Sequence, residues 1–158
     1  MTDRMRGNLY VSIQFVLLAL LGFVPVGSAW PTDGLVGVAG LVLLAVGAVI
    51  LAISFVNLGK ALTAHPIPLE KATLKTTGLY AVVRHPIYLG LLVVAFGLVL
   101  RAGSFWHVLF FVALSVLLHV KAGFEERLLR KAYPEYEQYA RRVGRLVPRL
   151  PGSRGGER

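Results

Sequence analysis

Long runs without any charged side chain divide the chain into four apolar stretches. They cover residues 7–32, 34–59, 85–100 and 102–120. An α-helix needs about 20 apolar residues to cross about 30 Å of hydrocarbon. The third stretch is short, at roughly 24 Å, but Arg101 at its end can snorkel to the surface, or the bilayer can thin locally. The pattern predicts four transmembrane helices, near 9–29, 35–57, 86–101 and 105–121.

The composition agrees with a membrane protein and excludes three other classes. The chain has 158 residues, of which 56% are hydrophobic and 16% charged, and it has no Cys. Soluble domains carry about 25% charged residues, and one small core would not bury this much apolar surface. The same numbers exclude intrinsic disorder, and the missing Cys excludes a disulfide-stapled domain. We therefore predict an all-α integral membrane bundle that forms a single membrane domain over residues 1–158.

The positive charges indicate how the chain is oriented. The net charge is +9, and sixteen of the seventeen Lys and Arg lie in the N-terminal segment, the loop 58–85 or the chain from Lys121 onward. With both termini cytoplasmic, all sixteen face inward, as the positive-inside rule expects. A three-span topology would put the loop or the tail on the wrong side. Because the charge follows topology, a nucleic-acid partner is not expected, and the bilayer itself is the expected partner.

A cleaved signal peptide is the alternative for the first stretch. The segment has a basic start and small residues at Gly27, Ser28 and Ala29. Its apolar part is longer than the usual 7–15 residues, and cleavage would leave three spans. We expect a retained, multi-pass protein. The richness in Ala, Gly, Leu, Val and Arg favours a prokaryotic cell membrane.

Small residues in the second stretch predict close helix packing. The residues concerned are Gly34, Gly37, Gly40, Ala48 and Ala52. Small side chains let helix backbones approach closely in lipid. The same glycines would also suit a homodimer.

The loop 58–85 is the first segment that suggests chemistry. It is longer than the 12–15 residues beyond which loops are usually functional or disordered, and its apolar residues favour an ordered loop packed on the bundle. It ends in Arg84-His85-Pro86-Ile87-Tyr88. Pro86 suits the first turn of a helix, and a helix start favours a negative group such as a carboxylate. The alternative is that Arg84 and His85 only anchor the helix at the lipid headgroups.

The tail 122–158 is the second such segment. Lys121 and Glu125 share one face of a continuing helix, and an exposed i,i+4 ion pair is the plain interpretation. Pro134 starts a short helix whose apolar face carries Tyr136, Tyr139 and Val143. The alternative for this helix is that it lies on anionic lipid.

Common catalytic signatures are absent from the sequence. The four His, at 65, 85, 107 and 119, lack metal-site spacing, so no metal is expected. There is no Gly-x-Gly-x-x-Gly, Walker loop or Gly-x-Ser-x-Gly. A soluble type of nucleotide domain is therefore not expected.

The two segments together carry a family resemblance. The first reads Leu74-x-x-x-Gly78-x-Tyr80-x-x-x-Arg84-His85-Pro86-x-Tyr88-x-Gly90, and the second Glu125-Glu126-x-x-Leu129-x-x-x-Tyr133-x-x-Tyr136-x-x-Tyr139 followed by Val147-Pro148. This order and spacing resemble the isoprenylcysteine carboxyl methyltransferase family and the related phospholipid methyltransferases. The resemblance covers about residues 55–150, and the first fifty residues match only as generic spans.

The resemblance implies a methyltransferase within the membrane that uses S-adenosylmethionine, releases S-adenosylhomocysteine, and acts on a lipophilic small-molecule or lipid-anchored acceptor arriving from the bilayer. The implied cofactor-binding residues are Leu74, Lys75, Tyr80, His85, Pro86, Ile87, Tyr88 and Glu125, with His65 near another such position. Lys121 falls where the family has a substrate-facing Arg, and Lys is not equivalent to Arg at a bidentate carboxylate site.

The roles of these residues follow from the cofactor's chemistry. The helix start and His85 would hold its carboxylate, Glu125 would accept hydrogen bonds from the ribose or ammonium, and Tyr80 or Tyr88 would pack on adenine or the sulfonium. The acceptor atom stays open among O, N and S. Two other functions stay open: an NADPH-dependent reductase of the sterol reductase type, and a non-enzymatic four-helix membrane module.

Overall fold

The computed structural model describes residues 2–59 and 74–149. Its elements are α1 (Asp3–Phe23), α2 (Gly34–Leu58), the 3-10 helix η2 (Gly78–Ala81), α3 (Pro86–Ala102), α4 (Phe105–Ala132) and α5 (Tyr136–Arg142). Within the described ranges, the nearest approach to a sheet is one parallel bridge between Val83 and Gly144. The predicted all-α class is confirmed.

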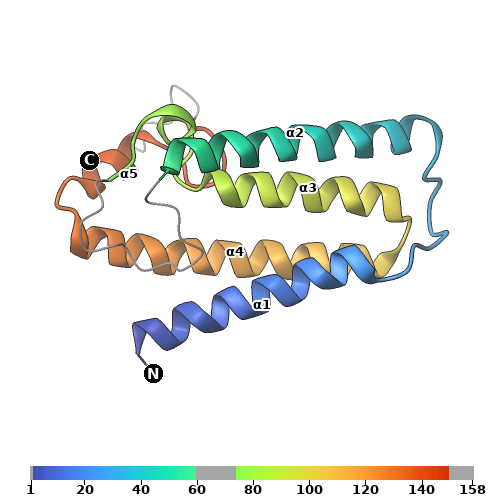
Figure 1. Ribbon diagram of the computed structural model, residues 1–158, viewed down its shortest axis with the longest axis horizontal. Helices are drawn as coiled ribbons and strands as arrows, with labels where there is room; N and C mark the ends of the chain where they lie inside the picture. The colour runs from blue at the N-terminus through green and yellow to red at the C-terminus, as the bar shows by residue number, and fades with distance from the viewer. Residues whose placement is uncertain (1, 60–73, 150–158) are drawn as a thin grey trace, which may run out of the picture.

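Helices α1 to α4 run alternately up and down and form the bundle in Figure 1. Helix α2 packs along α3, α3 contacts α4, and α4 contacts α1. Three of them, α1, α2 and α4, are long and apolar enough to cross a membrane, and α3 is a shorter apolar helix. Large hydrophobic side chains such as Val16, Val46 and Val116 are exposed on the outside of the bundle. This is an integral membrane bundle whose outer surface suits lipid.

The first helix lies nearer the N-terminus than predicted. We expected a span at 9–29, and α1 covers Asp3–Phe23. At its start, the Thr2 side chain accepts a hydrogen bond from a first-turn N–H. At its end, Pro25 disfavours the helical conformation of the preceding residue, and Val24 is extended, with φ −65 and ψ 136. The predicted boundaries were wrong because they followed the uncharged stretch alone and did not take the Thr2 cap and Pro25 into account.

The other boundaries agree with the predictions. Helices α2 and α3 match the predicted spans 35–57 and 86–101 within a residue at each end. The fourth span was expected to end near residue 121 with its helix continuing past Glu125, and helix α4 continues to Ala132. Phe124 and Glu126 in this extension are buried against the rest of the protein, and this packing allows the helix to extend beyond its apolar stretch.

Glycines bring α2 and α3 into close contact. A Cβ atom on Gly47 would lie 2.6 Å from the Val94 Cγ2 atom, and one on Gly97 would lie 2.9 Å from the Gly40 carbonyl oxygen. Close packing of the second span was therefore predicted correctly, and its partner is α3 of the same chain. Ala48 and Ala52, however, are exposed, so the prediction of close packing was wrong at these two positions. Gly40 and Gly47 are thus already used within one chain and do not support the expected homodimer.

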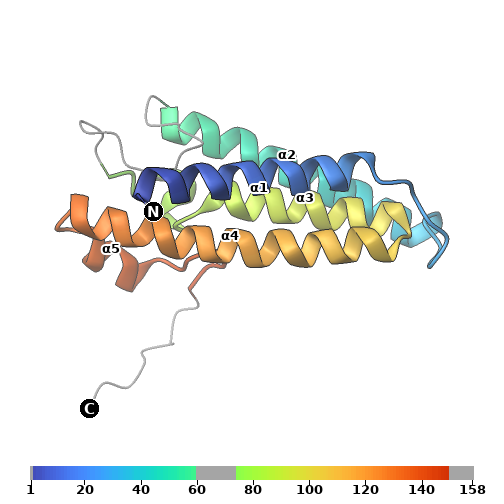
Figure 2. The ribbon, with the colours of Figure 1, turned by 90° about the horizontal axis from the view of Figure 1, so that it is seen from below.

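One end of the bundle gathers both ends of the described chain. In Figure 1 the start of α1, the segment around η2, and α5 lie at this end, opposite the α1–α2 connection and the α3–α4 turn. Figure 2 shows α5 folded back beside the last turns of α4. This end carries the polar residues of both sequence segments.

Candidate functional site

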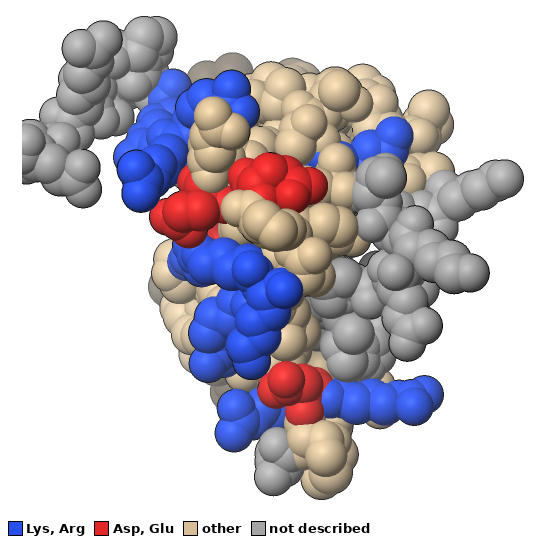
Figure 3. All heavy atoms as spheres, turned by 90° about the vertical axis from the view of Figure 1, so that its left-hand side faces the viewer, with Lys and Arg blue, Asp and Glu red and all other residues tan. Residues whose placement is uncertain are grey.

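The polar end of the bundle combines acidic side chains with a basic surround. Figure 3 views this end and shows Asp and Glu side chains between groups of Lys and Arg. Beneath this surface, Glu125 and Glu126 in the last turns of α4 face the start of α3. Two neighbouring carboxylates therefore meet the segment Arg84-His85-Pro86.

Glu125 forms one cluster with His85 and Tyr88. The Tyr88 hydroxyl donates to Glu125 Oε2 at 2.9 Å, and His85 Nδ1 lies 3.2 Å from the same oxygen. The His85 and Tyr88 rings stack with centroids 5.3 Å apart. The Glu125 side chain keeps 20% exposure, and its described contacts converge on one oxygen. The cluster therefore presents a carboxylate that is held in place and still accessible.

Lys121 lies one turn below this cluster, inside the bundle. It is 2% exposed, so the interpretation as an exposed ion pair was wrong. Its Nζ donates to the amide oxygen of Gln14, on α1, at 2.7 Å. The same ammonium lies 5.1 Å from the centre of the Tyr88 ring, close enough for a cation–π contact. A buried cation thus faces the ring whose hydroxyl binds Glu125.

Glu126 is the centre of a second, more buried cluster. Its side chain is 0% exposed. Arg84 Nη2 lies 2.9 Å from Glu126 Oε1, and Arg145 Nη2 lies 2.7 Å from Oε2, with the Nε atoms of both Arg at 3.0 Å from Oε1. His85 Nε2 approaches Oε1 to 3.4 Å. Arg84 and His85 are thus internal ion-pair partners, and the alternative that they only anchor a helix at the headgroups was wrong.

The tail closes over this cluster through its backbone. The Arg84 N–H donates to the Gly144 carbonyl at 2.8 Å, and the His85 N–H donates to the Arg145 carbonyl at 3.1 Å. Arg84 Nη1 also donates to the Val143 carbonyl at 2.6 Å. His85 is therefore held from both sides, by the carboxylates of α4 and by the tail.

The apolar face of α5 packs inside the protein. Tyr136, Tyr139 and Val143 form a buried cluster, and Leu74 and Leu129 pack against it. The Tyr139 hydroxyl donates to the Tyr80 carbonyl at 2.5 Å. The amphipathic pattern was predicted correctly, but the alternative that this face rests on anionic lipid was wrong, because its tyrosines are covered by the chain itself.

The remaining predicted cofactor residues separate into three groups. Pro86 is fully buried and Ile87 packs against the main apolar core, so both build the fold. Tyr80 is buried, and Leu74 is half-buried while Lys75 is exposed at the edge of the cluster. His65, like half of the loop 58–85, lies outside the described residues, so the prediction of an ordered loop stays a prediction.

The start of α3 was expected to offer three N–H groups. The Leu89 N–H donates to the His85 carbonyl at 3.1 Å, so it already has a partner. Pro86 occupies the first turn, as predicted, and the His85 side chain makes no cap hydrogen bond. The N–H groups of Ile87 and Tyr88 remain those that a helix start presents to an anion.

Burial and the two carboxylates set the protonation of the site. Burial lowers the pKa of His85, but hydrogen bonds and charge from Glu125 and Glu126 outweigh burial and raise its pKa above the ordinary value. Both ring nitrogens face carboxylates, which suits the doubly protonated ring. Burial, together with the charge of Glu125, raises the pKa of Tyr80 far above its ordinary range. The site therefore favours an imidazolium beside a neutral phenol.

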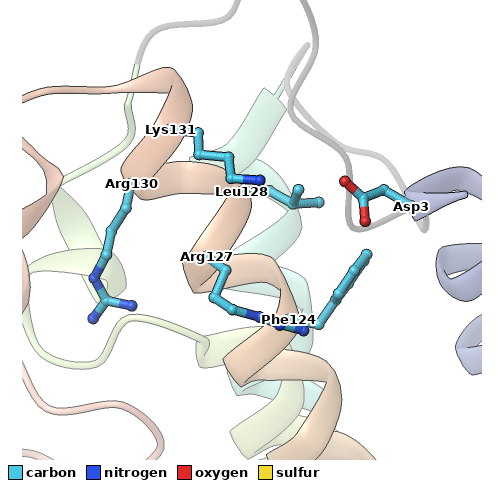
Figure 4. A pocket seen from close by; sticks show the side chains of 6 residues that line it. All are labelled: Asp3, Phe124, Arg127, Leu128, Arg130 and Lys131. Atoms are coloured by element: carbon cyan, nitrogen blue, oxygen red, sulfur yellow. The ribbon is translucent and has the colours of Figure 1, made fainter.

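A separate groove lies on the other side of α4. It has a volume of about 220 Å³ and is lined by Asp3, Phe124, Arg127, Leu128, Arg130 and Lys131. Figure 4 shows Asp3, at the start of α1, across from Phe124 and Leu128 of α4. It contains none of the predicted site residues. Among the described residues, no group of three or more His, Cys, Asp or Glu is arranged to hold a metal ion.

Sequence reasoning missed the residues that hold the site together. Glu126 and Arg84 stood in the motifs, but neither was proposed as a site residue, and Arg145 seemed one basic tail residue among several. Gln14 was hidden in the first apolar stretch. A polar amide in the middle of a membrane span needs a hydrogen-bond partner. Gln14 was therefore the one sequence signal that pointed to a polar contact inside the bundle.

The fold and this polar end define a helical membrane protein with a carboxylate–imidazole–tyrosine cluster at one face. The sequence model of the family described as phospholipid methyltransferase matches residues 35–136. The chain belongs to the phospholipid methyltransferase family, a family of methyltransferase enzymes, and the resemblance in the two motifs is confirmed at this level. The match contains α2, α3 and α4 and leaves α1 outside.

Curated relatives share the same central region. Methanethiol S-methyltransferase 1 of Bradyrhizobium diazoefficiens is 42% identical over 76 residues, which are 47% of this chain and 26% of that protein. A probable protein-S-isoprenylcysteine O-methyltransferase of Oryza sativa subsp. indica is 33% identical over 118 residues, 72% of this chain and 61% of the relative. The cobalt-zinc-cadmium resistance protein CzcN of Cupriavidus metallidurans is 39% identical over 85 residues, 52% of this chain and 39% of the relative. The chain thus spans between about a quarter and three fifths of these relatives.

Proposed function

We propose that this protein transfers a methyl group from S-adenosylmethionine to a lipophilic thiol within the membrane. The observation that carries the proposal is the Glu125–His85–Tyr88 cluster set directly above the buried ammonium of Lys121. Family membership supports methyl transfer as the reaction.

The polar groups of this end fit the proposed cofactor. Glu125 has an accessible carboxylate that accepts hydrogen bonds from a ribose or an ammonium group, and its orientation is fixed by Tyr88 and His85. The N–H groups at the start of α3 favour a carboxylate. Of the two tyrosines that the resemblance implies, the Tyr88 ring already stacks on His85 and faces Lys121, so we propose Tyr80 as the aromatic partner of a base or a sulfonium. Leu74 and Lys75 border the same end, which agrees with their proposed role.

Lys121 supports an anionic acceptor with a single reacting atom. An ammonium is a point charge, whereas a guanidinium matches the two oxygens of a carboxylate. A thiolate presents one charged sulfur, and a neighbouring cation lowers a thiol's pKa and so increases its thiolate fraction. Methanethiol is the acceptor in the name of one relative. A protonated amine, by contrast, would be repelled by Lys121.

When bound, the cofactor supplies a methyl group on an activated sulfonium. The protein's own work is to hold the acceptor in line with that group and to keep water out. Lys121 stabilises the acceptor as a thiolate, and the thiol proton leaves to solvent. Tyr88 contacts both charged groups, the Lys121 ammonium through its ring and Glu125 through its hydroxyl. Held by Glu125 and the start of α3, the cofactor would supply the methyl group in exchange for its own sulfonium–methyl bond, and the products would be a methyl thioether and S-adenosylhomocysteine.

The site is proposed to face the cytoplasm. The start of α1, η2 and α5 lie together at this end (Figure 1), and Arg84, Arg130 and Arg145 lie there too. An excess of Lys and Arg marks cytoplasmic segments. Both termini would then be cytoplasmic, where the soluble cofactor is made available, while the acceptor arrives from the bilayer.

A labelled-methyl assay tests this proposal. Detergent-purified protein is incubated with S-adenosylmethionine carrying a labelled methyl group and with octanethiol, octanoate or octylamine. We expect label in methyl octyl sulfide, little in the ester, and none in the amine. Glu125→Gln is expected to abolish transfer, while Glu137→Gln, at an exposed position of α5, retains it.

Other outcomes point to other functions. Label in the amine product would exclude the role given to Lys121. Transfer that survives Glu125→Gln would remove this carboxylate from the site. Binding of NADPH without S-adenosylmethionine would instead support the reductase alternative, and binding of neither by folded protein would favour a non-enzymatic module.

A further inference from the structure

The groove beside α4 has no part in the chemistry assigned above. It has a volume of about 220 Å³ and lies between Asp3, at the start of α1, and the last turns of α4 (Figure 4). Sites for drug-sized ligands and cofactors enclose about 300–1,000 Å³, so this groove is small for a whole cofactor. Its size suits a compact polar group, such as the headgroup of a lipid.

The groove combines an apolar floor with basic side chains. Phe124, which is 3% exposed, and the half-buried Leu128 form the floor. Arg127 and Lys131 are exposed and, being four residues apart, lie on one face of α4. The Arg127 guanidinium lies 5.6 Å from the centre of the Phe124 ring. Basic groups beside an apolar surface are the combination that an amphiphilic anion needs.

The positive charge of the groove is not neutralised by the chain. Among the described residues, neither Arg127 nor Lys131 forms an ion pair with a carboxylate. Arg130, the third basic residue of the lining, extends away from the other two in Figure 4 and pairs with Glu137 at 2.9 Å. Asp3 is the one acidic residue of the lining, and an acidic residue in the first turn already stabilises its own helix. Two unpaired cations against one carboxylate leave the groove with a net positive charge.

The lengths of the two helices place the groove at the depth of lipid headgroups. Helix α1 has 21 residues, about 32 Å, so Asp3 at its start lies at the edge of a hydrocarbon layer about 30 Å thick. Helix α4 has 28 residues, about 42 Å, and its last turns therefore project beyond that layer. The phosphates of the bilayer lie at this level.

We propose that this groove binds the phosphate of an anionic membrane lipid such as phosphatidylglycerol. Arg127 and Lys131 donate to the phosphate oxygens, and the glycerol end of the lipid rests on Phe124 and Leu128. Basic pockets between transmembrane helices are known to take anionic headgroups in this way. The bound lipid touches both α1 and α4 and so links the two helices. The inference is independent of the proposed methyl transfer, because the groove contains none of the residues assigned to that reaction.

Native mass spectrometry of the detergent-purified protein, titrated with dioleoyl-phosphatidylglycerol, tests this site. We expect one lipid to bind saturably to the wild type. Removal of one basic charge near an anionic lipid weakens binding about fivefold. Arg127→Gln and Lys131→Gln should therefore each raise the Kd by about that factor, and the double variant should raise it about twentyfold or more. Both positions are exposed, and the melting temperature without lipid checks that the variants remain folded.

Two further variants separate the groove from the basic surface around it. Arg141→Gln removes the same charge from α5, at a position that is 75% exposed and outside the groove, and should change the Kd by less than about twofold. Asp3→Asn removes the negative charge beside the phosphate and should lower the Kd. Phosphatidylglycerol should also raise the melting temperature of the wild type more than that of the Arg127→Gln/Lys131→Gln protein.

Four results would overturn the inference. An equal loss of affinity in Arg141→Gln would show attraction to the basic surface in general. Displacement of the lipid by inorganic phosphate would identify a site for a free anion. Tighter binding of phosphatidylethanolamine than of phosphatidylglycerol, or weaker binding of phosphatidylglycerol in Asp3→Asn, would show that the groove selects a headgroup with its own positive charge. Methyl transfer to octanethiol is measured separately, so the proposed function stands or fails without regard to these results.

Discussion

Glu126 holds the C-terminal tail on the site, and its removal should release the tail. The carboxylate is 0% exposed and pairs with Arg84 at 2.9 Å and with Arg145 at 2.7 Å. Glu126→Gln keeps the shape but removes the charge, and its new amide N–H groups face two guanidinium groups. Breaking a buried ion pair from one side costs about 3–5 kcal/mol. Because Arg145 is still 31% exposed, we take the lower end, about 3 kcal/mol.

Hydrogen exchange measures this effect directly. The amide N–H groups of Arg84 and His85 donate to the tail at 2.8 Å and 3.1 Å, so they exchange only when the tail opens. A cost of about 3 kcal/mol corresponds to a roughly hundredfold larger open population. We therefore expect these two amides to exchange about a hundredfold faster in Glu126→Gln than in the wild type.

A matched surface variant provides the comparison. Glu137 pairs with Arg130 at 2.9 Å but is 53% exposed, and exposed pairs contribute about 0–1 kcal/mol. Glu137→Gln should change exchange at Arg84 and His85 by less than about fivefold. If Glu126→Gln behaves like this control, Glu126 does not fasten the tail, and the reasoning is refuted.

Three further predictions concern single residues. The pKa of His85 is raised, so the stability that its charged ring contributes is complete below its ordinary pKa, about 6.5, and is lost as pH rises through the raised value. The wild type should therefore melt at a higher temperature than His85→Asn at about pH 6, and this difference should shrink toward about pH 9. A difference that stays constant with pH would contradict the prediction. Tyr139→Phe removes a buried hydrogen bond to a loop carbonyl and should lower stability by about 1–2 kcal/mol, whereas Tyr136→Phe should cost little, since the Tyr136 hydroxyl has no hydrogen-bond partner among the described residues; equal losses in thermal unfolding would count against it. Gly47→Ala places a Cβ into α3 and should cost about 1–3 kcal/mol, while Gly22→Ala, with open space around it, should be neutral or stabilising by comparative melting.

The sequence predicts the helices well wherever the apolar pattern alone decides. Helices α2 and α3 follow their uncharged stretches closely. Helix α1 does not, because the cap at Thr2 and the break at Pro25 override the pattern. Helix α4 continues past its apolar stretch, because its extension contacts α5 and pairs with Arg84 and His85.

The site is only partly predictable for a physical reason. The family resemblance implied His85, Tyr88 and Glu125, and the structure brings these three together. The pairing of Lys121 with Gln14 joins residues 107 positions apart, and nothing in a single sequence specifies such a contact. The pairing of Arg145 with Glu126 is not specified by the sequence either, because several arginines of the tail are equivalent in sequence. The backbone bridge between Val83 and Gly144 places Arg145, and not another arginine, next to Glu126.

His85 contributes both to the stability of the fold and to the candidate site. His85 is held by α4 on one side and by the tail on the other. A cofactor bound at Glu125 would therefore stabilise the tail indirectly, because Glu125 and Glu126 share His85 as a partner.

Calorimetric titration of the detergent-purified protein with S-adenosylhomocysteine tests the central claim most directly, with NADPH titrated in parallel and Glu125→Ala as the comparison. The account predicts saturable binding of S-adenosylhomocysteine to the wild type, no binding of NADPH, and loss of binding in a Glu125→Ala protein that still melts cooperatively. Binding of NADPH alone, or unchanged S-adenosylhomocysteine binding in Glu125→Ala, would contradict it.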